Sequence, residues 1–227
     1  EDALPRDVYE QLEKEWPEDQ LLSTEPFDKG ICYRLKADEM LKPGKVYNAW
    51  KEFTEYHTSM EIYKEMMEVL GNFVPHVEDL TLSPRGWDTG NDKIGTDCQT
   101  VMHKPINFSS RTPHIDNPRE IYAALLYMPC KDDQSTGGEF QIHETHDNIL
   151  EVNKNGGREV NEKAGKVVKT VPYKANTLVV FCNNSTRCVH SVSARKDAVL
   201  HRRSVNIIAE YNRAAKCSMF EVKENRR

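Results

Sequence analysis

Large apolar side chains recur every three or four positions in the first third of the chain. Between residues 45 and 73 this spacing is typical of helices with one buried face, and it is carried by Val46, Trp50, Phe53, Met60, Tyr63, Met67 and Leu70. Thr58 and Glu61 have the spacing of a capping box that would begin a second helix, and Gly71 would end it. A shorter helix is expected over residues 7–16. Its buried side would carry Val8, Leu12 and Trp16.

The pattern changes after about residue 80. Residues 83–97 are rich in Gly, Pro and Asp and predict a loop. Short apolar and β-branched runs then alternate with turn sequences such as Ser135-Thr136-Gly137-Gly138. The predicted strands are residues 99–102, 121–128, 139–143, 167–171, 177–182, 189–193 and 203–211. Many short strands with regular turns predict a β-sandwich or barrel, with the preceding helices bracing one outer face.

A highly charged segment, residues 144–166, interrupts the succession of strands, with Asn155-Gly156-Gly157 at its centre. A solvated surface loop and a lid over a functional site are both compatible with this composition. The sequence does not choose between them.

Composition narrows the class of protein. A chain of 227 residues with 38% hydrophobic and 30% charged residues is typical of a globular domain with a core. A net charge of -5 argues against a nucleic-acid partner, and the longest near-apolar run, residues 121–128, is too short to cross a bilayer. The six cysteines form no Cys-x-x-Cys pair, so we expect reduced thiols and a cytoplasmic location.

Two histidines and one aspartate have the types and spacing of an iron site. His114 and Asp116 are separated by one residue, so on a strand both side chains would point the same way. The third ligand has to come from a distant strand, and His190 lies at the start of the one predicted at 189–193. Two imidazoles and a carboxylate on one side of an ion leave open positions for co-substrate and O2. The alternatives are a surface role for His114 and a core role for His190.

Other histidines and one cysteine compete for the same role. His76-Val77-Glu78 has a related spacing, but it follows a helix and has no strand pattern around it. Cys188 precedes His190 by two residues, yet cysteine there is more often a small buried hydrophobe. His143 and His146 have the spacing His-x-x-His, whereas the zinc-protease motif needs His-Glu-x-x-His. We expect the remaining histidines to be structural or on the surface: His57, His103 and His201.

Further motifs accompany the three candidate ligands in a set order. These are His114-Ile115-Asp116, the strand at 121–128, Gly137-Gly138-Glu139-Phe140, Lys174-Ala175-Asn176-Thr177 leading into residues 178–181, His190, and Arg202-Arg203-Ser204. This succession, over residues 98–211, resembles the 2-oxoglutarate and iron(II)-dependent dioxygenases, in particular their prolyl-hydroxylase-like branch. Residues 1–97 add only generic helical support.

The resemblance implies a mainly β fold with α support. Its core would be a double-stranded β-helix (jelly-roll, cupin-like) at 98–211, braced by a helical region at 1–80 within a single oxygenase domain covering 1–227. It also implies Fe(II) held by His114, Asp116 and His190. 2-Oxoglutarate and O2 would be co-substrates, and ascorbate would be stimulatory.

In that family a basic residue after the distal histidine binds the far carboxylate of 2-oxoglutarate, with a hydroxyl two residues on. Arg202 and Ser204 match this spacing, since Arg202 follows His190 by twelve residues. Arg203 is the adjacent alternative. We favour Arg202 because Asn206 and Ser204 share its phase along the strand, suited to a polar cavity. The phase of Arg203 is instead shared by an apolar row, Val205, Ile207 and Ala209. Either arginine could also serve only to protect a sheet edge.

The activity implied by the resemblance is hydroxylation of an unactivated C–H bond, with release of succinate and CO2. Halogenating relatives have a small residue where Asp116 stands, so halogenation is disfavoured, while desaturation and ring formation stay open. The substrate would be a small molecule or a peptidyl residue such as proline, with no nucleic-acid or membrane partner. The alternatives are a non-catalytic metal- or ligand-binding cupin-like module and a zinc hydrolase. Neither needs a 2-oxoglutarate anchor such as Arg202.

Overall fold

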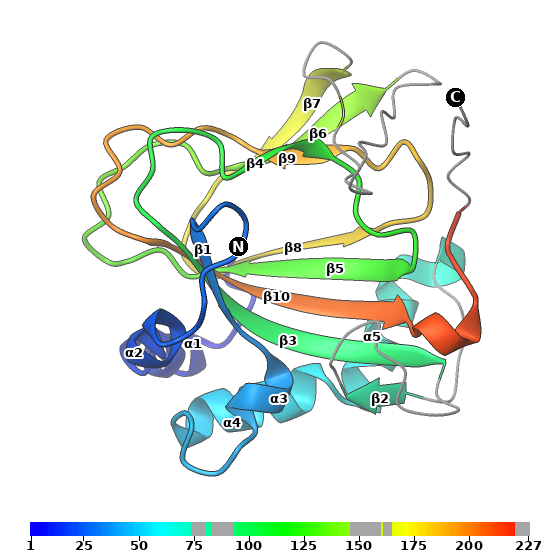
Figure 1. The fold of residues 1–227 in the computed structure, drawn as a ribbon, viewed down its shortest axis with the longest axis horizontal. Helices are drawn as coiled ribbons and strands as arrows, with labels where there is room; N and C mark the ends of the chain where they lie inside the picture. The colour runs from blue at the N-terminus through cyan, green and yellow to red at the C-terminus, as the bar shows by residue number, and fades with distance from the viewer. Residues whose placement is uncertain (74–79, 83–92, 146–159, 161–164, 221–227) are drawn as a thin grey trace.

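Two β-sheets face each other, and the helices lie against the outer face of the larger one (Figure 1). This computed structural model describes all residues except 74–79, 83–92, 146–159, 161–164 and 221–227. The predicted fold class, mainly β with helical support in a double-stranded β-helix, is confirmed. No helix in the described ranges is long and apolar enough to cross a membrane.

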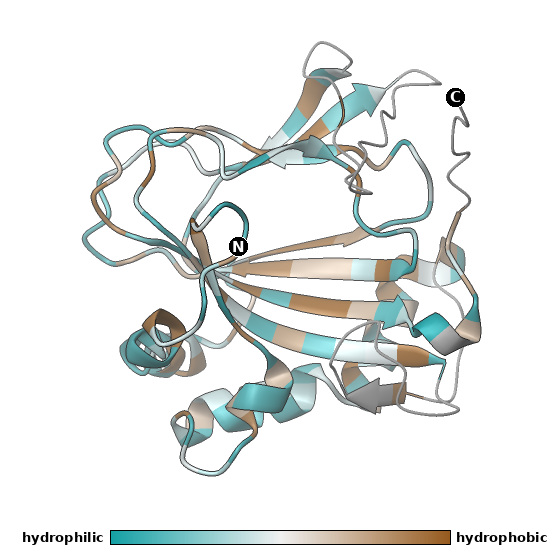
Figure 2. Cartoon of the chain, in the orientation of Figure 1, coloured by the Kyte–Doolittle hydropathy of each residue, from teal (hydrophilic) through white to brown (hydrophobic). Residues whose placement is uncertain are grey.

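The larger sheet has six strands in the order β1-β3-β10-β5-β8, with β2 beside β3. Its strands are β1 (Cys32–Leu35), β2 (Leu80–Leu82), β3 (Ile94–His103), β5 (Glu120–Tyr127), β8 (Thr177–Cys182) and β10 (Arg202–Tyr211). Only β2 runs parallel to its neighbour, and the other pairs are antiparallel. Hydrophobic residues are concentrated on β5, β8 and β10, as the brown colouring in Figure 2 shows.

The smaller sheet has four antiparallel strands in the order β4-β9-β6-β7. They are β4 (Arg111–His114), β6 (Phe140–Thr145), β7 (Gly165–Val171) and β9 (His190–Val192). From β4 onward the chain passes repeatedly between the two sheets, which is the connectivity of a jelly roll. This alternation places the ends of β4 and β9 opposite the inner face of β10.

The helices cover the outer face of the larger sheet. They are α1 (Arg6–Lys14), α2 (Glu18–Leu22), α3 (Ala37–Met40), α4 (Asn48–His57) and α5 (Met60–Leu70), with short 3-10 turns at Gly71–Phe73 and Arg213–Ala215. Trp50 and Tyr63 are fully buried there and pack in one core with Val205, Ile207 and Ala209 of β10. The predicted placement of the helices on one outer face is therefore confirmed.

Two details of the helix predictions are wrong. The cap of α5 is Ser59, whose hydroxyl accepts a hydrogen bond from the backbone N–H of Ile62 at 3.5 Å, rather than Thr58. Val8 is 41% exposed, because the buried face of α1 runs through Tyr9 and Leu12 instead. The predicted end of α5 at Gly71 is correct, and this glycine has a φ of 57°.

The strand predictions differ from the structure mainly at short or polar segments. Residues 94–97 belong to β3 rather than to a loop, because they pair with β10 on one side and residues 94–96 pair with β2 on the other. The buried Asp97 also accepts a hydrogen bond from the backbone N–H of Ala37 at the start of α3. The strands β1, β2 and β4 were not predicted. Most of the charged segment 144–166 lies outside the described residues, and so does His76-Val77-Glu78.

Candidate metal centre and adjoining cavity

The pairing of β4 with β9 brings together three side chains that are far apart in the sequence. His114 ends β4 and His190 begins β9, and the two residues are direct partners in the antiparallel register. Asp116 follows β4 by two residues. Its carboxylate oxygens lie 3.7 Å from Nε2 of His114 and 3.3 Å from Nε2 of His190. One nitrogen or oxygen from each side chain can be chosen so that all lie within 4.8 Å of one another.

Backbone carbonyl groups set the tautomer of both imidazoles. Nδ1 of His114 lies 2.7 Å from the carbonyl oxygen of Thr112, and Nδ1 of His190 lies 3.0 Å from that of Cys188. A carbonyl oxygen can only accept, so each ring donates its Nδ1–H, and Nε2, which lies toward Asp116, is the nitrogen left for a metal ion. Metal-binding histidines are oriented by this kind of bond. Two neutral imidazoles and a carboxylate are a donor set that fits iron(II).

The ionisation states of His114 and Asp116 agree with that donor set. Burial, with the neighbouring His190 and Arg111, lowers the pKa of His114 to about 3, so its ring is neutral at physiological pH. Burial alone would raise the pKa of Asp116. The adjacent His190 and His114 outweigh this effect and hold the pKa of the carboxyl below its usual range.

Aromatic rings and an asparagine hold the site in place. The ring of Phe140 stacks on His190 at 5.2 Å between centroids, and Phe181 approaches the same imidazole at 4.7 Å. The buried Asn183 donates hydrogen bonds from Nδ2 to the carbonyl oxygens of Asn117 at 2.8 Å and Glu120 at 3.2 Å. Asn183 thereby anchors the segment that follows the candidate carboxylate ligand.

A cavity of about 150 Å³ adjoins the three side chains. It lies between the sheets, and β10 contributes Arg202, Ser204 and Asn206 to its wall. Ser204 is buried, and its hydroxyl lies 3.5 Å from Oδ1 of Asn206. The cavity also contains His103, which is buried and was expected only to be structural or on the surface.

Arg202 has the environment of an anion site. Its side chain is buried, and its Nε donates to the carbonyl oxygen of Gly138 at 3.2 Å. The guanidinium carbon lies 4.7 Å from the ring centre of Tyr173 and 5.3 Å from that of Tyr127. Its Nη2 is buried and has no hydrogen-bond partner among the described residues. A buried cationic nitrogen without an acceptor is costly, so this orphaned donor fits a carboxylate ligand.

Arg203 points away from the cavity. Its Nη2 lies 2.6 Å from Oε2 of Glu18, and its guanidinium carbon lies 5.3 Å from the ring centre of Trp16. These contacts connect β10 to the helical layer. The alternation along β10 therefore places Arg202 and Ser204, and not Arg203, on the cavity wall, as the phase of the apolar row predicted.

The other candidate side chains lie in structural settings. Nε2 of His143 lies 2.8 Å from the hydroxyl of Ser191, and the ring of His57 stacks on Phe53. The thiol of Cys188 contacts Asn184 and not the triad, while the carbonyl of Cys188 orients His190. His146 lies outside the described residues, and Nδ1 of His201 lies 3.5 Å from Glu18. All six cysteines are described, and all are free thiols.

Sequence reasoning missed Asn183, Tyr173 and the stacking of Phe181. Polar residues after a strand and aromatic residues within one are common, so their types carried no signal. Phe140 was part of a recognised motif, but its contact with His190 depends on the pairing of β6 with β9.

Neither protein-family models nor curated proteins match this sequence, whereas solved structures do. A prolyl-4-hydroxylase from Pseudomonas putida is similar with a TM-score of 0.50 and 16% identity, over 93% of this chain and 89% of that one. A 2OG-Fe(II) oxygenase family protein from Burkholderia pseudomallei has a TM-score of 0.49 and 12% identity, over 92% and 80%. A prolyl 4-hydroxylase from Phytophthora capsici has a TM-score of 0.47 and 14% identity, over 81% of this chain and 49% of that one, so this chain spans about half its length. The first similarity establishes that this chain has the prolyl-hydroxylase-like fold.

Proposed function

We propose that the protein is a 2-oxoglutarate-dependent non-haem iron(II) dioxygenase that hydroxylates an unactivated C–H bond. The observation that carries this proposal is a pair of features in one cavity. One is a His114, Asp116 and His190 cluster in which Nε2 of both imidazoles lies toward the carboxylate. The other is the buried Arg202, with a guanidinium nitrogen that has no acceptor among the residues that the structure describes. The prolyl-hydroxylase-like fold agrees with this proposal.

Each residue has a defined role in this proposal. His114, Asp116 and His190 would hold iron(II), and Arg202 would bind the far carboxylate of 2-oxoglutarate, with the Ser204 hydroxyl beside it. Bound iron(II), with 2-oxoglutarate and O2, would supply an oxidation that inserts one oxygen atom into the substrate C–H bond and converts 2-oxoglutarate to succinate and CO2. The protein contributes ligand orientation, a dry cavity and the placement of the substrate.

Several surroundings of the site support this assignment of roles. Phe140 and Phe181 cover the His190 ring and exclude water from that side. Tyr127 and Tyr173 flank Arg202 and keep its guanidinium in a low-dielectric setting, where pairing with a carboxylate is strong. A metal-binding module without turnover would have no use for a buried cation that lacks an acceptor. The substrate we propose is a small molecule or a peptidyl residue such as proline.

The test is succinate release. The purified protein is loaded with iron(II), its iron content is measured, and it is incubated with 2-oxoglutarate and ascorbate under air. We expect succinate from uncoupled turnover, which should be lost in His190→Ala and when O2 is removed. Iron bound at one equivalent without any succinate would reject the oxygenase and favour a non-catalytic cupin-like module.

A further inference from the structure

Arg111 shares the cavity with the candidate iron ligands although its position in β4 would not place it there. It precedes His114 by three residues, and in a regular strand such residues face opposite sides of the sheet. The pairing of β4 with β9 shifts register between Arg111 and His114, and both side chains line the cavity. Irregular pairing of this kind is used next to active sites to re-aim a side chain.

The ion pair that Arg111 makes is weak and open to exchange. Its Nη1 lies 3.5 Å from Oδ2 of Asp28, and the two side chains are 46% and 29% exposed. A long ion pair between half-exposed groups contributes little to stability. A ligand carboxylate that faces both terminal nitrogens of the guanidinium would bind more strongly than this single long contact.

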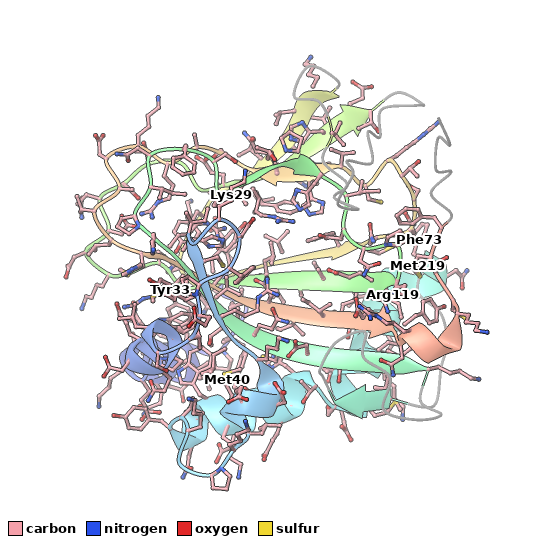
Figure 3. The ribbon with its side chains drawn as sticks, viewed as in Figure 1. Lys29, Tyr33, Met40, Phe73, Arg119 and Met219 are labelled. Carbon is pink, nitrogen blue, oxygen red and sulfur yellow. The ribbon has the colours of Figure 1, made fainter. Side chains whose placement is uncertain are left out.

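Asp28 comes from a tight loop that reaches the smaller sheet. Phe27 and Cys32 form a β-bridge at its base, and Asp28 and Lys29 have φ values of 53° and 61°. Figure 3 shows Lys29 at the tip of this loop. The loop also contributes Phe27 to the cavity wall, backed by the guanidinium of Arg34 at 4.2 Å. The space beside Arg111 thus joins a cation to an apolar ring.

Arg111 and Arg202 are separate anion-binding groups. Arg202 is buried in the larger sheet between two tyrosine rings, whereas Arg111 is half-exposed in the smaller sheet. The buried cation suits a co-substrate that is fully enclosed. The half-exposed cation suits a group that enters last and leaves with the product.

We propose that Arg111 binds a free carboxylate of the prime substrate, so that the substrate is a carboxylic acid whose apolar part lies against Phe27. This inference rests on the proposed oxygenase function and adds its substrate class. In the absence of substrate, Asp28 occupies the place of that carboxylate. An uncharged stretch of peptide would leave the guanidinium with its long ion pair and gain nothing from it.

The experiment compares acids with their amides. The iron-loaded protein is incubated with 2-oxoglutarate and each of the standard L-amino acids, or with the matching carboxamide. The readout is succinate formed above the level without amino acid, together with hydroxylated product by mass spectrometry. We expect some acids to stimulate turnover about 10- to 100-fold more than their amides, which is the effect of one charge-assisted hydrogen bond.

Three variants test whether Arg111 causes the preference for acids over amides. In Arg111→Gln, turnover with an acid should fall to the level with its amide, so that the ratio between the two approaches one. Arg111→Lys should restore part of the preference for the acid because it keeps the charge. Arg6→Gln is the matched control, since Arg6 is an exposed arginine paired with Glu10 on α1, and its ratio should equal that of the unmodified protein. Each protein is its own reference, so a general loss of activity does not affect the ratio.

Two results overturn the inference. One is an unmodified protein that treats acids and amides alike, which includes a response to neither. The other is a preference for acids that survives in Arg111→Gln. Succinate formed without any amino acid distinguishes a failure of the substrate class from a failure of the proposed oxygenase function. If this succinate is present, only the substrate class is wrong. If it is absent although iron is bound, the proposed function has failed.

Discussion

Replacing Arg202 with methionine separates the binding of 2-oxoglutarate from folding and from iron binding. The methionine keeps much of the volume and removes the charge. A 2-oxoglutarate carboxylate would gain two charge-assisted hydrogen bonds from the guanidinium, at about 1.5–3 kcal/mol each. Losing both costs about 3–6 kcal/mol, so the concentration of 2-oxoglutarate needed for half-maximal succinate release should rise about 100-fold or more.

Stability should respond differently to the same substitution. Arg202→Met removes the hydrogen bond to Gly138, but it also removes a buried guanidinium nitrogen that has no acceptor in the described structure. The two effects oppose each other, so we expect the free energy of unfolding without ligand to change by less than about 1 kcal/mol. Urea denaturation measures this change. Bound iron should stay at one equivalent, because Arg202 is not among the proposed ligands.

Arg203→Met is the matched control. It breaks the ion pair with Glu18 and the contact with Trp16 on the opposite face of β10. We expect a loss of about 1 kcal/mol in stability and an unchanged 2-oxoglutarate requirement. If Arg203→Met raises that requirement and Arg202→Met does not, the inference that Arg202 binds 2-oxoglutarate because it lies on the cavity face of β10 is refuted.

Three further substitutions test the site and its support. His114→Ala should reduce the iron content of the purified protein by orders of magnitude, as measured by metal analysis, because one of the three proposed ligands is lost. Asn183→Ala removes a donor from two carbonyl groups, of which that of Asn117 still accepts from the backbone N–H of Glu120, so urea denaturation should show a loss of about 1–3 kcal/mol, with weaker iron binding. Gly137→Ala should destabilise by more than about 2 kcal/mol, because its φ is +83° and a Cβ there would overlap the carbonyl oxygen of Ala194.

Each of these has an outcome that would contradict it. One equivalent of iron in His114→Ala would exclude that residue as a ligand. Unchanged stability in Asn183→Ala would mean that the segment after Asp116 holds its conformation by itself. Gly30→Ala is the control for Gly137→Ala, because Gly30 also has a positive φ, of +76°, but nothing lies within 4 Å of its Cβ position. If both cost the same, only backbone conformation and not the close approach matters at Gly137.

The helical and strand periodicities predicted most of the longer elements, because each depends on neighbours within a few residues. The segment 177–182 was predicted with the bounds of β8, and α5 ends at Gly71 as expected. The failures were segments whose structure depends on distant partners. The polar start of β3 is extended because it pairs with β10 and β2, and β4 is a strand only through its pairing with β9.

In the candidate site, too, some features follow from local sequence and others depend on the pairing of distant strands. Residues two apart on a strand share a face, so the sequence alone determined that Arg202 and Ser204 lie together, away from the apolar row of β10. Only the tertiary structure decided that His114 stands opposite His190, that carbonyl groups hold Nδ1 of both rings so that Nε2 lies toward Asp116, and that a shift of register turns Arg111 into the same cavity. Those arrangements arise from pairing between strands that are distant in the chain, and the register of such pairing is chosen by the packing of the whole fold and not by local sequence.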